Sequence, residues 1–242
     1  LLIFKPIKML KIIDLGLKEY KEVWDLQKSL QQKLINGYPD DYLIVCSHQE
    51  TITLGKSSKK ENILLSEKEL NKQLISVYEI ERGGDVTWHG PQQIILYPIL
   101  NLKRHKTDVA WYLRQLEMVI ISTLDVFSIP TKLIAGKTGV WIDLKNKSSK
   151  EKKIAAMGVR ISRWCTLHGL SLNVLNCQKN FNIINPCGFS DIESTSIEDE
   201  LKLLANHNNL SQNLYDNTKN LLIDNFVKAF SFRDTCYEKT KN

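Results

Sequence analysis

The switch between two hydrophobic periods constrains the fold of this chain more than any other feature of its sequence. The run Ile94–Leu100 is apolar on both faces, as expected for a strand buried inside a layered fold. The next segment repeats apolar residues at helical spacing, after an N-cap signal at Thr107-Asp108 and before Pro130. Its apolar positions are Val109, Leu113, Leu116, Ile120, Leu124 and Phe127. The two patterns together predict an α/β or α+β fold, in which helices are layered on a mixed β-sheet.

The other expected elements follow the same two periods. Helical spacing predicts helices at Leu17–Ile35, Ile197–Leu204 and Leu221–Phe230, the first of them ended by Gly37 and Pro39. Strands are expected at Asp41–Cys46, Ile75–Ile80, Val140–Ile142, Ile154–Ile161 and Leu170–Leu175. The strands at Val140 and Ile154 should form a hairpin, joined by a low-complexity loop over Lys145–Lys152 that we expect to be mobile. We expect a single domain over 1–242, with its motifs within about 15–189 and C-terminal helices within 195–235.

Composition excludes several classes of protein. The chain has 242 residues, 43% of them hydrophobic, and a net charge of +6, which suits a globular domain with acidic partners. Its five cysteines form no C-x-x-C pair, so neither a disulfide framework nor a zinc site is indicated, and Cys46 and Cys165 are expected in the core. No apolar run is long enough to span a membrane. The first residue is Leu rather than Met, which suggests a trimmed chain, so the compartment is not fixed: cytoplasmic in a bacterium, mitochondrial or plastid in a eukaryote.

Three glycine-containing segments carry the chemistry. Arg82–Pro91 is either a tight turn with a surface Arg and a satisfied His or a ligand loop, and its density of polar groups favours the loop. Lys153 stands at the start of an apolar strand. It is either a solvent-exposed residue at the end of that strand or a desolvated amine able to accept a proton. Cys187 lies between Pro186 and Gly188, and it is either a small buried side chain or a nucleophile. The residues themselves leave the last two choices open.

These segments, in this order, resemble the motifs of the lipoyl(octanoyl) transferases. The motifs are Arg82-Gly83-Gly84 to Thr87-x-His89-Gly90-Pro91, Lys153-Ile154 to Gly158, His168-Gly169 and Asn185-Pro186-Cys187-Gly188, with His48 and Thr53-Leu54-Gly55 upstream. The chain departs from the family pattern at Gln92, where a glycine is usual, and in the lengthened loop at Lys145–Lys152. The resemblance covers roughly Leu15 to Phe189.

The resemblance implies a fold like that of the biotin and lipoate protein ligases, and transfer of an octanoyl group from octanoyl-acyl carrier protein to a lysine of a lipoyl domain. It implies that Cys187 attacks the thioester and that Lys153 moves the protons. The positions expected to line the octanoyl slot are Arg82, Gly83, Gly84, Asp85, Val86, Thr87, Trp88, His89, Ala156, Met157, Gly158, Gly169, Leu170 and Ser171. Backbone N–H groups among them are expected to hold the oxyanion, while His89 and His168 shape the pocket.

The resemblance also implies the partners of the enzyme. These are octanoyl-acyl carrier protein and the apo lipoyl domains of 2-oxoacid dehydrogenases and the glycine cleavage H protein. We expect a monomer without metal or prosthetic group. An ATP-dependent lipoate or biotin protein ligase is the main alternative, because such a ligase has a similar glycine loop but needs no cysteine nucleophile. A basic nucleic-acid-binding module is the less favoured one, because the aromatic residues lie mostly at apolar-face positions.

Overall fold

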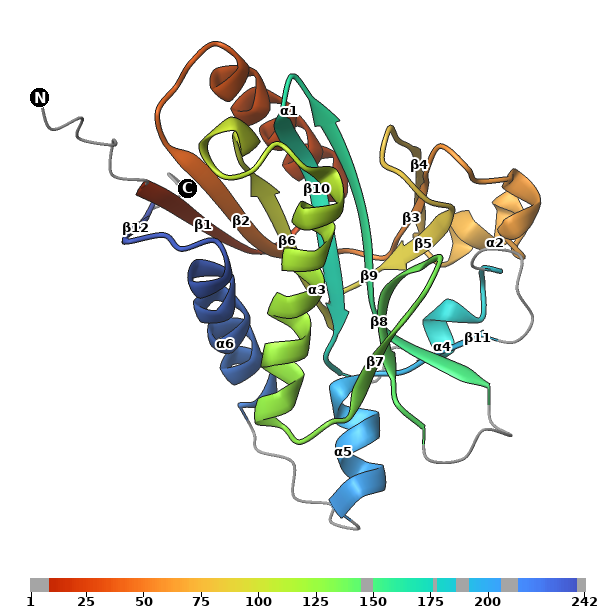
Figure 1. Cartoon of the computed structure of the whole chain (residues 1–242). Helices are drawn as coiled ribbons and strands as arrows, with labels where there is room; N and C mark the ends of the chain where they lie inside the picture. The colour runs from red at the N-terminus through yellow and green to blue at the C-terminus, as the bar shows by residue number, and fades with distance from the viewer. Residues whose placement is uncertain (1–8, 145–149, 176–177, 186–191, 206–212, 239–242) are drawn as a thin grey trace, which may run out of the picture.

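The protein is built on one large mixed sheet with helices on both faces (Figure 1). The computed structural model describes residues 9–144, 150–175, 178–185, 192–205 and 213–238. Along the sheet the strand order is β12 (Asp234–Tyr237), β1 (Met9–Lys18), β2 (Asp41–His48), β6 (Gln93–Ile99), β10 (Cys165–Asn173), β9 (Glu151–Ser162), β8 (Lys137–Ile142) and β7 (Thr131–Ile134). The short β11 (Ile192–Ser194) pairs with β9 outside this path. β12, β1 and β2 run parallel, and the remaining pairs along the path are antiparallel, so the predicted mixed sheet in a layered α/β fold is confirmed.

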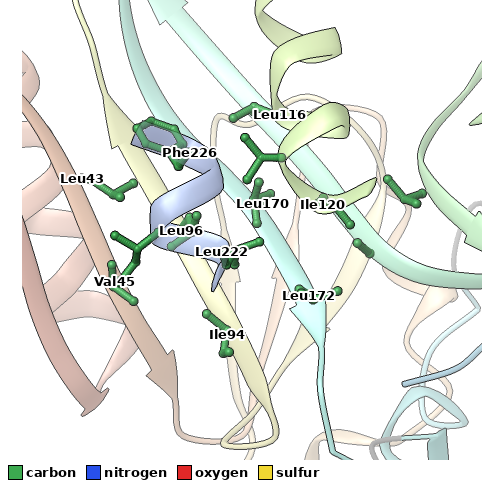
Figure 2. Close-up of a cluster of buried hydrophobic side chains, with 14 of the residues drawn as sticks. Leu43, Val45, Ile94, Leu96, Leu116, Ile120, Leu170, Leu172, Leu222 and Phe226 are labelled. Atoms are coloured by element: carbon green, nitrogen blue, oxygen red, sulfur yellow. The ribbon is translucent and has the colours of Figure 1, made fainter. Parts of the chain in front are cut away.

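The two faces of the sheet are covered by different helices. α3 (Val109–Val126) and α6 (Leu214–Ala229) cover one face, and their side chains pack with Leu96 and Leu170 of the central strands (Figure 2). α1 (Tyr20–Ile35) covers the other face over Ile95 and Tyr97. Because Ile95, Leu96 and Tyr97 alternate between the two cores, β6 is buried on both sides, as its unbroken apolar run predicts.

A second, three-stranded sheet stands beside the large one. Its order is β4 (Ser76–Glu79), β3 (Thr51–Leu54) and β5 (Val86–His89), and it has a small core of its own around Ile52 and Trp88. The remaining helices are α2 (Glu67–Lys72), α4 (Gln178–Phe181) and α5 (Ile197–Ala205), with 3-10 turns at Lys60–Asn62 and Leu102–Arg104. This second sheet is absent from the sequence prediction, which places a loop across β5.

The outer edge of strand β9 is only partly paired. β8 pairs with β9 only at Lys153 and Ala155, with a bulge between the two pairs. Farther along, the outer edge of β9 meets the loop before β5 instead, where the Gly83 N–H donates to the Val159 carbonyl over 3.0 Å. The sheet therefore parts beside Ala156–Gly158.

Several expected boundaries need correction. The helix expected from Leu17 begins at Tyr20, because Leu17 and Lys18 continue the pairing of β1 with β2. The last strand expected from Leu170 begins at Cys165, and the last helix expected from Leu221 begins at Leu214. The hairpin of β8 and β9 is confirmed, but residues 151 and 152 belong to β9 rather than to the loop, and the expected mobility of residues 145–149 lies outside the described residues.

Two further expectations concern single residues and the membrane. Cys46 and Cys165 are both buried, as predicted. Among the described residues, no helix is both long enough and apolar enough to cross a membrane.

Candidate active site

A cavity of about 490 Å³ brings the sequence motifs together. Its walls come from β5 and the loop before it, from β9 and β10, from the first turns of α3 and from the β7–β8 turn. The predicted positions that line it are Arg82, Gly83, Gly84, Asp85, Val86, Thr87, His89, Lys153, Ala156, Met157, Gly158, Gly169, Leu170 and Ser171. Segments that are distant in the sequence therefore meet at one concave site, as ligand sites do.

Trp88 is the predicted lining residue that the structure places elsewhere. In β5 the side chains of Thr87 and His89 face the cavity, so the Trp88 side chain points to the opposite side of the strand. There it is fully buried in the small core, edge-on to Phe181, and its indole N–H donates to Glu50 over 2.6 Å. Trp88 therefore stabilises the small sheet.

Arg82 holds the glycine loop in shape. Its guanidinium is buried and donates to the Thr53 carbonyl over 2.8 Å, to the Thr53 hydroxyl over 3.0 Å and to the Gly83 carbonyl over 3.1 Å. Gly84 has a φ of +89°, which favours glycine, and a Cβ on Gly55 would lie 2.4 Å from the Gly84 carbonyl oxygen. The turn thus requires Gly84 for its φ and Gly55 for its close approach, and the Arg fixes that turn to β3.

Asp85 connects this loop to the segment that leads to Cys187. The Asn62 side-chain amide donates to the Asp85 carboxylate over 2.8 Å, and the Asn62 carbonyl accepts from the Asn185 N–H over 2.7 Å. An isolated bridge between Ile63 and Ile184 supports the same contact. Cys187 itself lies outside the described residues.

Lys153 lies at the point where β9 separates from β8. Its Nζ lies 4.9 Å from the centroid of the Trp141 ring, within cation–π range. A Cβ on Gly139 would come within 2.5 Å of the Lys153 Cε, so the glycine leaves room for the Lys side chain. The Lys153 carbonyl accepts from the Thr195 N–H over 3.0 Å, which fixes the backbone from the side of β11.

Two histidines line the cavity, and a third lies behind it. Burial lowers the pKa of His89 well below its ordinary value, and the neighbouring His48 and Arg82 act in the same direction. Burial also lowers the pKa of His48 to about 4; its ring bonds the Tyr97 hydroxyl and the Lys18 carbonyl, both at 2.9 Å. Burial lowers the pKa of His168, although the Glu81 carboxylate, 3.9 Å from its Nε2, acts in the opposite direction. Neither ring nitrogen makes a hydrogen bond within the described part of the chain. All three rings are therefore neutral near pH 7.

The sequence prediction missed several lining residues. The missed residues include Tyr20, Ile95, Tyr97, Val109, Leu113, Gly136, Lys137, Thr138, Trp141 and Asn173. Most belong to regular helix or strand patterns and are indistinguishable from core residues in the sequence. Only Lys137 and Trp141, which flank Gly139, offered a local signal.

The comparisons with known proteins agree with this geometry. The family described as the lipoyl protein ligase A/B catalytic domain matches residues 19–219. The octanoyltransferase of Cytophaga hutchinsonii is 45% identical over 207 residues, 80% of this chain and 84% of that protein. The octanoyltransferase of Clostridium kluyveri is 36% identical over 221 residues, 91% of each chain. A bipartite lipoate protein ligase of Thermoplasma acidophilum superposes with a TM-score of 0.63 over 96% of this chain and 87% of that one, at 12% identity, which shows a shared fold.

Proposed function

The chain belongs to the lipoyl protein ligase A/B catalytic-domain family as one of its octanoyltransferases, and on this premise we propose that Cys187 and Lys153 carry out the transfer. The donor is octanoyl-acyl carrier protein and the acceptor is a lysine of an apo lipoyl domain, in a 2-oxoacid dehydrogenase or the glycine cleavage H protein. The chain acts in this proposal as a single catalytic domain and as a monomer.

The first half of the reaction forms an acyl-enzyme. The Cys187 thiol gives its proton to the Lys153 amine, and the thiolate attacks the carbonyl carbon of the octanoyl thioester. The bond from that carbon to the pantetheine sulfur breaks, and the departing thiolate takes the proton from the Lys153 ammonium. Octanoyl then remains on Cys187 as a thioester.

The second half moves octanoyl to the acceptor. The lysine amine of the lipoyl domain attacks the acyl-enzyme carbonyl, a C–N bond forms, and the bond to the Cys187 sulfur breaks. Lys153 accepts a proton from the attacking amine and returns it to the Cys187 thiolate. Backbone N–H groups along the open edge of β9, beside Ala156–Gly158, are the candidates for holding the oxyanion in both halves.

The proposal is supported by the contacts that hold the chain before and after the segment containing Cys187. Upstream, Asn185 is held through Asn62 to Asp85 of the glycine loop. Downstream, β11 runs parallel to β9, with Ser194 opposite Lys153. The segment that bears Cys187 therefore starts and ends beside the cavity that Lys153 lines. This placement supports a Cys-Lys pair over a structural cysteine.

An ATP-dependent ligase is not favoured. The relatives that are 36–45% identical are octanoyltransferases, whereas the likeness to lipoate ligases shows the fold alone. A Cys-His pair remains a distinct chemical alternative to Cys-Lys, and the test below separates the two.

Intact mass measurement tests the proposal. The protein is mixed with octanoyl-acyl carrier protein without ATP, beside a Cys187→Ala variant. We expect one octanoyl adduct on the wild type, removable by hydroxylamine, and none on the variant. An adduct that requires ATP and free octanoic acid, or one that persists in Cys187→Ala, would overturn the proposal.

Two neighbouring lysines provide a matched comparison for the base. Lys153→Met should abolish formation of the acyl-enzyme. Lys152→Met should retain it, because Lys152 bonds Glu200 at 3.4 Å and does not line the cavity. Loss of acylation in His89 or His168 variants, with full activity in Lys153→Met, would replace Lys153 by a histidine.

A further inference from the structure

A chain of buried amides fixes the tautomer of His89. The chain starts at the Thr195 carbonyl, which can only accept a hydrogen bond, so the group of Asn173 that lies 2.9 Å away is its NH₂ donor. The Asn173 side-chain oxygen then faces Gln93 and accepts from the Gln93 NH₂ over 2.8 Å. The Trp88 carbonyl, 3.3 Å from the same NH₂ group, sets the Gln93 amide independently in the same orientation.

The amide orientation leaves one possibility for the imidazole. The Gln93 side-chain oxygen faces His89 Nδ1 at 3.2 Å and can only accept, so Nδ1 carries the proton. Nε2 therefore holds a lone pair, and it has no hydrogen-bond partner among the residues that the structure describes. The ring lines the cavity and stacks on Tyr20, with the centroids 6.0 Å apart and the planes 14° apart. Burial keeps the pKa of the ring low, so the lone pair remains available across the neutral range.

Among the reacting groups that the two substrates bring, a lone pair at this place suits only one. The octanoyl thioester offers only acceptor atoms at its reacting centre, and the oxyanion formed from it would be repelled by Nε2. The lysine amine that attacks the acyl-enzyme is the reacting group that brings N–H donors. An amine that donates one N–H to a fixed acceptor has its own lone pair directed away from that acceptor, free for the carbonyl carbon.

We propose that His89 is a positioning residue for the second half of the reaction, where its Nε2 accepts a hydrogen bond from the incoming lysine amine, and that Gln93 acts through His89 by holding this tautomer. The inference rests on the proposed acyl-enzyme route. It assigns no such role to His168, because the nearest polar partner of that ring, the Glu81 carboxylate, lies 3.9 Å from Nε2 and makes no hydrogen bond that would fix a tautomer within the described ranges.

The tautomer is tested directly on the unmodified protein. Long-range ¹H–¹⁵N correlation spectra of protein labelled in the histidine ring distinguish the two neutral tautomers and the imidazolium. We expect the His89 signals, assigned by their absence from His89→Gln, to show a protonated Nδ1 and a bare Nε2 at pH 7. A ring protonated at Nε2, or at both nitrogens, would overturn the inference.

Two variants test the role in the reaction. The shorter His89→Asn side chain can bond Gln93 but does not reach the Nε2 position, whereas His89→Gln can place an amide oxygen there. We expect formation of the octanoyl-enzyme to change less in both variants than the transfer step does, because the Nε2 lone pair meets no N–H donor of the substrate in the first half of the reaction. Transfer from that isolated intermediate to a lipoyl domain should fall on the order of 10-fold in His89→Asn and recover in part in His89→Gln.

The outcomes are separable from those of the proposed function. Equal transfer rates in wild type and His89→Asn, or an equal loss in both half-reactions, would refute a role confined to the amine. If the wild type forms no octanoyl-enzyme at all, the proposed function fails, while the tautomer measurement stands on its own. Thermal unfolding of both variants identifies any general loss of structure.

Discussion

Replacing Arg82 by Met should cost stability as well as activity. The family resemblance assigns Arg82 to the ligand slot and the structure places it on the cavity wall, but a residue that only contacts ligand can be removed with little effect on folding. The guanidinium also donates to the carbonyls of Thr53 and Gly83 and to the Thr53 hydroxyl, and the Arg82 residue is only 8% exposed. The variant therefore distinguishes a structural role of Arg82, which we call a brace between the glycine loop and β3, from a role as a substrate contact.

The magnitude follows from the groups left behind. A buried polar group that loses its partner costs about 1–3 kcal/mol, and Arg82→Met strips a donor from two carbonyls. Met also removes the cost of burying a guanidinium charge, which offsets part of the loss. We expect the free energy of unfolding to fall by about 2–4 kcal/mol.

Urea unfolding followed by circular dichroism measures this change. The control is Arg160→Met, because the Arg160 side chain is 43% exposed and its ion pair with Glu81 is long, at 3.7 Å, so its removal should cost less than about 1 kcal/mol. The Thr53→Val variant, combined with Arg82→Met in a double-mutant cycle, should show a coupling of about 1 kcal/mol. A loss below about 1 kcal/mol in Arg82→Met, with octanoyl transfer abolished, would refute the brace and return Arg82 to the ligand.

Three further predictions concern single side chains. His48 has its folded pKa lowered from 6.5 to about 4, so its stabilising effect is complete above pH 6.5 and is lost as the pH falls towards 4. His48→Gln should therefore flatten the acid limb of stability against pH by about 3 kcal/mol, measured by urea unfolding at several pH values, and an unchanged slope would contradict the burial argument. Gly158→Ala places a Cβ 2.7 Å from the Gly83 carbonyl oxygen, so octanoyl-enzyme formation in a timed mass assay should drop more than 10-fold, and wild-type kinetics would show that the loop can yield. Asp41→Asn removes the buried carboxylate that pairs with Arg104 and should lower the urea midpoint by an amount equivalent to about 3 kcal/mol; because Asp41 does not line the cavity, the rate of acylation should not change.

The sequence predicts the elements whose hydrophobic period is uninterrupted. The helix expected at Val109 begins at that residue, because Asp108 caps it by accepting from the Trp111 N–H. The first strand is missed because a bulge between Asp14 and Gly16 breaks its alternation, and the last apolar residue of that strand, Leu17, fits the helical spacing of the next element. The start of α6 is missed because the polar Thr218 is buried there, bonded to the Leu214 carbonyl.

The residues of the candidate site also differ in how well the sequence predicts them. Motif residues such as Lys153 and Gly158 could be named from the sequence, because their residue types are unusual in a core strand. Gln93 could not be assigned a role, since its importance depends on Asn173, a cross-strand neighbour from β10. Trp88 was assigned to the wrong side, because an isolated motif does not show that a strand runs through it and alternates its side chains.

The pairing of β1 with β12 has a consequence for synthesis. Met9 lies opposite Asp234, so β1 leaves the ribosome long before the strand that covers its edge. Until then β1 presents free backbone donors and acceptors beside Leu10 and Ile12, which is a template for pairing with another nascent chain. A chain whose translation ends before Asp234 would therefore contain the cavity residues but would leave the backbone edge of β1 unpaired. Pairing with the four residues of β12 thus covers the backbone edge of β1.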